Sequence, residues 1–232
     1  MITPSTTNDT LVLALDRAPV NALDLPMVEA MERAFADIVR QAPKNGVVLT
    51  GAGKAFCAGV DTRVFAAYGA DQRRALVLAI TRMTANLLSI PCPVVAAVNG
   101  YALGGGFVLM LCADYRLATG DAGARFGLLE AQAGVPFPAG SIEIIADQLP
   151  PQLLRRWTLA STVLGGEDML AKGIVDEIRP PADLVRHAAT TAARLAAQPA
   201  FATVKQQVRG ALAARVAALA ASGTDAHMAA FL

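Results

Sequence analysis

Backbone groups, rather than reactive side chains, are the chemical feature that stands out in this sequence. Three glycines, Gly104-Gly105-Gly106, follow the apolar run Val94–Val98 and precede an apolar helix-like segment at 107–111. A buried strand that feeds a helix through three glycines leaves bare N–H groups at the start of the helix. Such groups stabilise an anion or a polarised oxygen. A glycine triplet alone is equally compatible with a tight turn that only allows close packing.

The known phosphate-binding patterns do not fit this triplet. A G-x-G-x-x-G fingerprint starting at Gly104 would need glycine at position 109, where the chain has Leu109. No Gly-Lys-Ser/Thr sequence follows, which also excludes the phosphate loop. A second loop, Phe56-Cys57-Ala58-Gly59-Val60-Asp61, comes after another apolar run at 46–50. The chain therefore has two separate loops that could present backbone donors.

Taken together, the two loops resemble those of the crotonase (enoyl-CoA hydratase/isomerase) superfamily. The matching segments, 51–61 and 99–106, occur in the expected order and at the expected separation. The resemblance covers nearly the whole chain from Asn21 onward and is weakest after about Leu195. It implies that the backbone amides of Val60 and Gly105 form an oxyanion hole for the thioester oxygen of an acyl-CoA. Donors placed there would stabilise an enolate more than the neutral ground state, which is the condition for catalysis.

The resemblance also implies which residues surround the bound CoA. The backbone of Ala58 and Val60 is expected to line the adenine pocket. Arg17 lies where the family contacts the CoA phosphates, although an ordinary surface arginine would fit nearly as well. Gly104, Gly105 and Val108 complete the expected substrate-binding set. Neither a metal nor a separate cofactor is expected, because coenzyme A is part of the substrate.

The carboxylates indicate which family reaction to expect. Family hydratases use two glutamates, but the position two residues after the glycine triplet is Val108, which cannot titrate, and only the second, Glu130, is present. Leucines, an alanine and the nearby Phe137 should partly desolvate Glu130 and raise its pKa toward that of a useful base. One carboxylate is enough to remove a proton at C2 and return it at C4. The pattern, with Gly134-Val135 after a lone glutamate, also resembles mitochondrial Δ3,Δ2-enoyl-CoA isomerases and favours that activity.

Two other functions stay open. One is a 2-enoyl-CoA hydratase in which Glu130 works with an ordered water or with Glu143. The other is a non-catalytic acyl-CoA-binding or assembly subunit that lost its activity with the carboxylate at 108. His187 and His227 lie far along the chain from the glycine loops, so a Ser-His or Cys-His nucleophile is not expected. Candidates for the acyl pocket, each equally a core residue, are Phe65, Tyr68, Met83, Phe107, Phe137 and Trp157.

Apolar periodicity predicts the elements that position these residues. Strands are expected at 10–16, 46–50, 94–98, 113–118 and 124–126, and helices at 27–38, 71–87, 107–111, 141–148 and 151–160. Their alternation predicts an α/β fold with mostly parallel pairing, and the resemblance makes this a crotonase-like spiral β-β-α core. Residues 128–140 are expected to form an irregular loop. The alanine-rich chain after Ala182 is expected to be almost continuous helix.

Length and composition limit the remaining possibilities. The chain has 232 residues, of which 54% are hydrophobic, and a net charge of +1. We expect a core at 1–180 and a C-terminal helical region at 181–232 that, by the resemblance, builds a homotrimer or a dimer of trimers. The near-neutral charge argues against nucleic acid, and no apolar run approaches the roughly 20 residues that cross a membrane. A polar N-terminus and three cysteines without disulfide or metal spacing predict a cytoplasmic protein.

Overall fold

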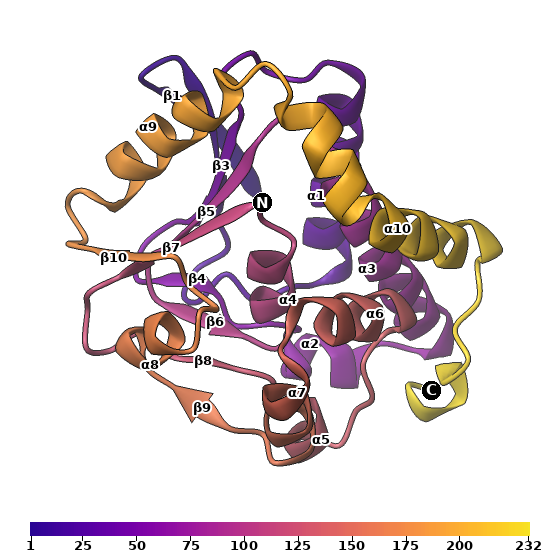
Figure 1. Cartoon of the computed structure of the whole chain (residues 1–232). Helices are drawn as coiled ribbons and strands as arrows, with labels where there is room; N and C mark the ends of the chain where they lie inside the picture. The colour runs from indigo at the N-terminus through magenta and orange to yellow at the C-terminus, as the bar shows by residue number, and fades with distance from the viewer.

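The computed structural model describes residues 1–232, which form two β-sheets surrounded by helices (Figure 1). The larger sheet contains, in spatial order, β1 (Ile2–Thr7), β2 (Thr10–Leu15), β3 (Val47–Gly51), β5 (Val94–Val98), β7 (Tyr115–Thr119) and β10 (Glu177–Arg179). The smaller sheet contains β4 (Ala55–Cys57), β6 (Tyr101–Leu103), β8 (Phe126–Gly127) and β9 (Val163–Leu164). All neighbouring strands are parallel except the pairs β1–β2 and β8–β9. The predicted α/β fold with mostly parallel pairing is confirmed.

Ten α-helices and one 3-10 turn connect and cover these strands. They are α1 (Leu25–Arg40), α2 (Thr62–Ala67), α3 (Ala70–Ser89), α4 (Gly105–Leu111), α5 (Glu130–Ala133), α6 (Ala139–Gln148), α7 (Pro151–Leu159), α8 (Gly166–Ala171), α9 (Leu184–Ala196), α10 (Phe201–Ser222) and η1 (Met228–Ala230). Helix α9 covers one face of the larger sheet, whereas α1, α3 and α4 lie on the other side (Figure 1). None of these helices combines the length and apolar character needed to cross a membrane.

The central strands are apolar throughout because both faces of the larger sheet are buried. In β5, Val94, Ala96 and Val98 pack in the main core, while Val95 and Ala97 point to the opposite face. That opposite face packs against small side chains of α9 such as the buried alanines 188, 189 and 192. Successive side chains of a strand point to opposite faces, so a run without polar alternation fits a strand covered on both sides. Strand β5, which precedes the glycine triplet, is therefore held in place by packing on both of its faces.

Several elements differ from the sequence predictions, among them β4, β6, β9 and α2, which were not expected. Strand β1 was not expected, because its polar Ile2–Thr7 segment lies at an exposed sheet edge and pairs only with β2. The loop expected at 128–140 contains the one-turn helix α5, which stops at Gly134 in the left-handed conformation with φ of 75°. The helix expected after Ala182 is divided into α9 and α10 by residues 197–200, where Pro199 disfavours helical geometry at the residue before it.

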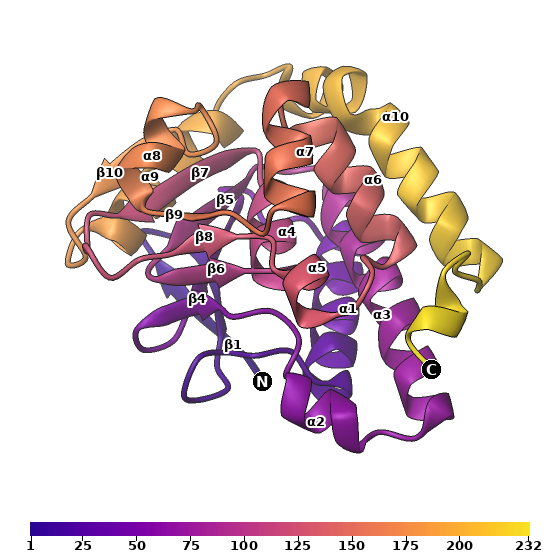
Figure 2. The ribbon, with the colours of Figure 1, turned by 90° about the horizontal axis from the view of Figure 1, so that it is seen from below.

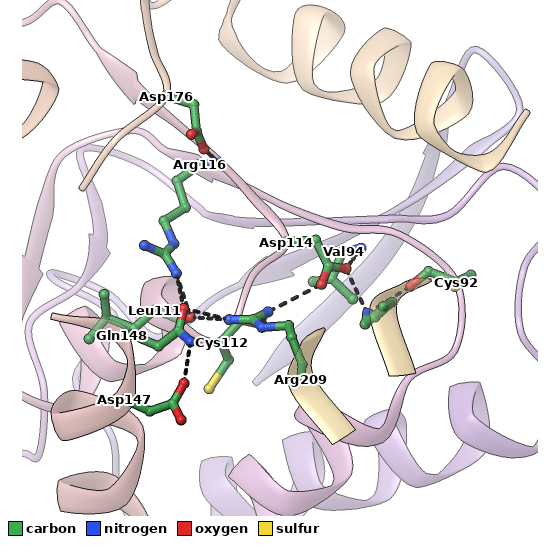
Figure 3. A network of polar contacts seen from close by, with 11 residues as sticks. Cys92, Val94, Leu111, Cys112, Asp114, Arg116, Asp147, Gln148, Asp176 and Arg209 are labelled. Atoms are coloured by element: carbon green, nitrogen blue, oxygen red, sulfur yellow. Dashed lines mark hydrogen bonds and ion pairs between the residues drawn. The ribbon is translucent and has the colours of Figure 1, made fainter. Parts of the chain in front are cut away.

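A buried ionic network attaches α10 to the core (Figure 3). Asp114 accepts hydrogen bonds from Lys205 Nζ at 2.6 Å and from Arg209 Nη1 at 3.1 Å. Arg209 also donates to the carbonyl of Cys112, just after α4, and to Gln148 of α6. Cations are favourable at the carboxyl end of a helix, where carbonyls lack partners. The network therefore holds the end of α4 opposite to its glycine-rich start.

Candidate active site

A cavity of about 220 Å³ lies where the two glycine loops meet α3 and the chain around α5. Figure 2 shows α2, α3 and α5 on the same side of the molecule as the C-terminus. The cavity wall is formed by parts of the loops at 58–60 and 103–105, by apolar side chains of α3, by parts of the segment 129–141 and by Phe231. Its polar side chains are Thr62, Glu130 and Ser141. The site is thus a mainly apolar cavity with a few polar groups.

The amide of Val60 is left free by the way its loop is held. Leu23 pairs with Val60 as an isolated parallel bridge: the Leu23 N–H donates to the Gly59 carbonyl at 2.7 Å, and the Asp61 N–H donates to the Leu23 carbonyl at 2.9 Å. In a parallel pair, the residues on either side of Val60 form the hydrogen bonds to Leu23, so the N–H of Val60 itself points away from Leu23. It donates to no backbone acceptor. Val60 lies in the cavity wall with Ala58 and Gly59.

Glycines allow the second loop to approach the first. Gly105 begins α4, so its N–H has no acceptor within the helix. Gly104 precedes it with φ of 51°, a conformation that residues with a Cβ rarely adopt. A Cβ on Gly106 would lie 2.1 Å from the Cys57 carbonyl oxygen, and one on Gly59 would lie 3.3 Å from the Gly105 nitrogen. The free amides of the two loops therefore border one cavity because side chains are absent between them.

Glu130 is the only carboxylate in the cavity wall. It is the first residue of α5, and its Oε1 atom would lie 3.0 Å from a Cβ placed on Gly104. The other carboxylate oxygen, Oε2, is buried and has no hydrogen-bond partner. Burial raises the pKa of Glu130 to about 7, partly opposed by the N–H groups of Glu130 and Leu129. A carboxylate of this pKa next to free amides is suited to general acid–base catalysis near neutral pH.

The other positions considered for proton transfer or substrate binding lie outside the cavity wall. Val108 is 2% exposed and packs in the main core, so the structure does not bring its side chain to the cavity surface. Glu143 is not part of the cavity wall, is partly exposed and pairs with Arg215 Nε of α10 at 3.0 Å. The structure therefore does not bring Glu143 into the cavity wall beside Glu130. No group of three or more His, Cys, Asp or Glu side chains is placed to hold a metal.

Arg17 also lies outside the cavity wall and is engaged in two ion pairs. Its guanidinium contacts Asp24 at 2.9 Å and Asp61 at 2.8 Å. Both partners cap helices: Asp24 accepts from the N–H of Met27 in α1, and Asp61 accepts from the N–H of Val64 in α2. That backbone hydrogen bond is the largest effect that lowers the pKa of Asp61. Arg17 joins the two helix starts, and its contact with CoA phosphates stays a prediction.

Some residues of the cavity wall were not singled out from the sequence. Of the candidates for the acyl pocket, Phe65 does line the cavity. Phe107 and Trp157 instead pack edge to face in the core, with their ring centres 5.4 Å apart. The wall instead includes Ser141 and Phe231, which lie far from the glycine loops in sequence. A serine directly after Gly140 in a helix start gives no chemical signal by itself. Only the folded contacts identify these two residues.

Comparisons with known proteins identify the family of this chain. Residues 6–230 match the enoyl-CoA hydratase/isomerase family. Carnitinyl-CoA dehydratase of Escherichia coli K12 is 32% identical over 205 residues, which cover 86% of this chain and 76% of that protein. An enoyl-CoA isomerase of Mycobacterium tuberculosis has a similar structure, with a TM-score of 0.84, 26% identity and 96% of each chain covered. An enoyl-CoA hydratase of Bacillus anthracis gives a TM-score of 0.82 at 26% identity, covering 96% of this chain and 90% of that one. The chain belongs to the enoyl-CoA hydratase/isomerase family of the crotonase superfamily.

Proposed function

We propose that this protein is an enoyl-CoA isomerase that moves a double bond of an acyl-CoA from Δ3 to Δ2, with Glu130 as its proton shuttle. One observation carries the proposal: Glu130 is the only carboxylate in the cavity wall, and one of its oxygens is buried without a partner. Its pKa of about 7 lets it accept a proton and release it again. Val108 and Glu143 leave no second carboxylate in the wall.

In this mechanism the thioester oxygen accepts hydrogen bonds from the amides of Val60 and Gly105. Glu130 takes a proton from C2, and the electrons of that C–H bond form the enolate, whose charge develops on the thioester oxygen. The C3–C4 double bond then accepts the proton at C4, which leaves a double bond between C2 and C3. Glu130 is ionised again at the end, and no water is consumed. Each oxyanion donor of this kind is typically worth about 10²–10³ in rate.

Hydration or dehydration is the second candidate. Two of the three relatives compared above favour it, namely the carnitinyl-CoA dehydratase and the enoyl-CoA hydratase, whereas the third is an enoyl-CoA isomerase. This reaction must handle a water oxygen as well as the α-proton, which is easiest with two groups. The cavity wall offers only one carboxylate, Glu130, so a bound water would have to take the second role.

Purified protein supplied separately with a 3-enoyl-CoA and a 2-enoyl-CoA distinguishes the candidates. We expect conversion of the 3-enoyl to the 2-enoyl thioester and no hydration of the latter. Glu130→Gln should slow the conversion by about 10²–10⁴. The matched control Glu143→Gln should keep the wild-type rate, because Glu143 pairs with Arg215 outside the cavity wall. Rapid hydration of the 2-enoyl-CoA with the 3-enoyl-CoA left unchanged would replace the isomerase by a hydratase. Binding of both thioesters without turnover would instead indicate an acyl-CoA-binding protein.

For the assembly, we propose a homotrimer or a dimer of trimers built through the C-terminal region at 181–232. Val204 and Val208 of α10 are 50% and 75% exposed, which leaves apolar surface available for a neighbouring subunit. We place the protein in the cytoplasm, where its three free cysteines would stay reduced.

A further inference from the structure

Ser141 is a polar side chain of the cavity that the proposed reaction does not use. It is the third residue of α6, is only 2% exposed and lies in the same cavity wall as Glu130. Its hydroxyl forms no hydrogen bond within the protein, so the cavity is where it can find a partner. Thr62, the other hydroxyl of the wall, differs because it is exposed to solvent. A hydroxyl that faces a cavity without a partner in the protein is available to a polar group of a bound ligand.

The start of α6 holds this hydroxyl in a fixed place. The N–H of Ala139 donates to Asp225 Oδ2 at 2.7 Å, which ties the helix start to the C-terminal segment. Gly140 packs so closely that an added Cβ would lie 2.9 Å from Cγ2 of Thr81 in α3. The N–H of Ser141 also belongs to the first turn, whose donors have no acceptor inside the helix and carry the positive end of its dipole. Ser141 therefore presents polar groups from a rigid position.

The contribution of α3 to the wall is apolar and consists of Leu76, Val77 and Ile80, and Phe231 adds another apolar surface. A hydrocarbon chain would suit these side chains but would leave the Ser141 hydroxyl without a partner. A site with a buried hydrogen-bonding group discriminates against ligands that cannot pair with it. An acyl chain with an oxygen at the right carbon would satisfy both kinds of surface.

We propose that Ser141 forms a polar subsite that binds a hydroxyl or oxo group on the acyl chain. The substrate class is then an oxygenated acyl-CoA rather than a plain hydrocarbon enoyl-CoA. The inference rests on the proposed acyl-CoA-binding function, but it is independent of whether the chemistry is isomerisation or hydration.

Binding of unreactive, saturated acyl-CoAs to the full-length protein tests the subsite. Calorimetry compares each hydroxyacyl-CoA with an alkyl-CoA of matched length, with the hydroxyl placed at successive carbons. At one position we expect the hydroxyl to tighten binding roughly three- to tenfold. Ser141→Ala and the size-matched Ser141→Cys should remove this preference. Ser89→Ala should keep it, because Ser89 bonds to Ala85 within α3, away from the cavity wall.

The outcomes separate this proposal from the proposed reaction. Glu130→Gln removes the base, yet it should preserve the hydroxyl preference, so a failure of the isomerase assignment leaves the subsite test intact. Absence of a preference at every carbon, or a preference that survives both Ser141 variants, would overturn the subsite. A protein that binds no acyl-CoA at all would overturn the subsite and the proposed function together.

Discussion

Glu130→Gln should lower activity while making the folded protein more stable at alkaline pH. Burial raises the pKa of Glu130 from 4.5 to about 7, so the folded state holds a proton that the unfolded state has released. The stability from this group is fully present below about pH 4.5 and is lost as the pH rises through about 7. A shift of that size corresponds to about 3 kcal/mol. Glutamine cannot ionise, so the variant avoids this loss.

Thermal unfolding at about pH 5 and about pH 9 measures the effect. At the lower pH the wild type and Glu130→Gln should differ little, while at the higher pH the variant should be more stable by up to about 3 kcal/mol. In a protein of this length 1 kcal/mol moves the midpoint by about 2–4 °C, so the gain is several degrees. Glu143→Gln is the matched control and should show no such gain, because Glu143 is partly exposed and paired with Arg215.

The activity of the same proteins gives the second half of the test. Wild-type activity should rise with pH through an apparent pKa near 7, because the ionised carboxylate is the base. Glu130→Gln should reduce turnover by about 10²–10⁴ while acyl-CoA binding survives. Equal stability of wild type and variant at both pH values would show that the carboxyl is not desolvated. Full activity of the variant would show that Glu130 is not the base.

Three further predictions follow from the loops, the helix α4 and the C-terminal region. Gly105→Pro should abolish turnover, because proline is compatible with a helix start but has no N–H to donate. Gly105→Ala should retain activity because it keeps the donor. Equal activity of the two variants would contradict the oxyanion hole. Val108→Glu places a carboxylate one turn after Gly104 and should introduce hydration of a 2-enoyl-CoA. The variant should be less stable than the wild type, because Val108 is buried. If no hydration is detected, the new carboxylate does not reach the substrate. Light scattering should give a mass that is a multiple of three protomers, and a monodisperse monomer at micromolar concentration would refute the trimer.

The features that could be predicted from the sequence are those with strong local signals. The run Val94–Val98 was assigned to a buried strand because nothing polar interrupts it, and β5 is indeed covered on both faces. An aspartate followed two residues later by proline is a signal for a helix start, and Asp24 accepts from the N–H of Met27 in α1 at 2.9 Å. The apolar neighbours of Glu130 in the sequence predicted that its carboxyl group is desolvated, and its burial in the structure raises its pKa as expected.

Features that depend on contacts between distant segments could not be predicted. Phe231 reaches the cavity because the chain after α10 packs back against Val77 of α3. The direction of Glu143 is set by Arg215, which lies 72 positions away. Strand β1 escaped detection because an exposed edge strand needs only backbone pairing and no apolar pattern. In each case the information lies in the partner segment rather than in the residue itself.

The candidate site is specified mainly by positions where a side chain cannot be present. Gly59 has φ of 82°, and a Cβ there would lie 2.8 Å from the Leu103 carbonyl oxygen. At Gly106 a Cβ would lie 2.1 Å from the Cys57 carbonyl oxygen. Val60, between these constraints, lies in the cavity wall with its amide free, while its side chain packs against the main core. Substitutions at Gly59 or Gly106 should therefore separate the two loops and remove both donors at once, even though neither residue supplies one of the two donor amides.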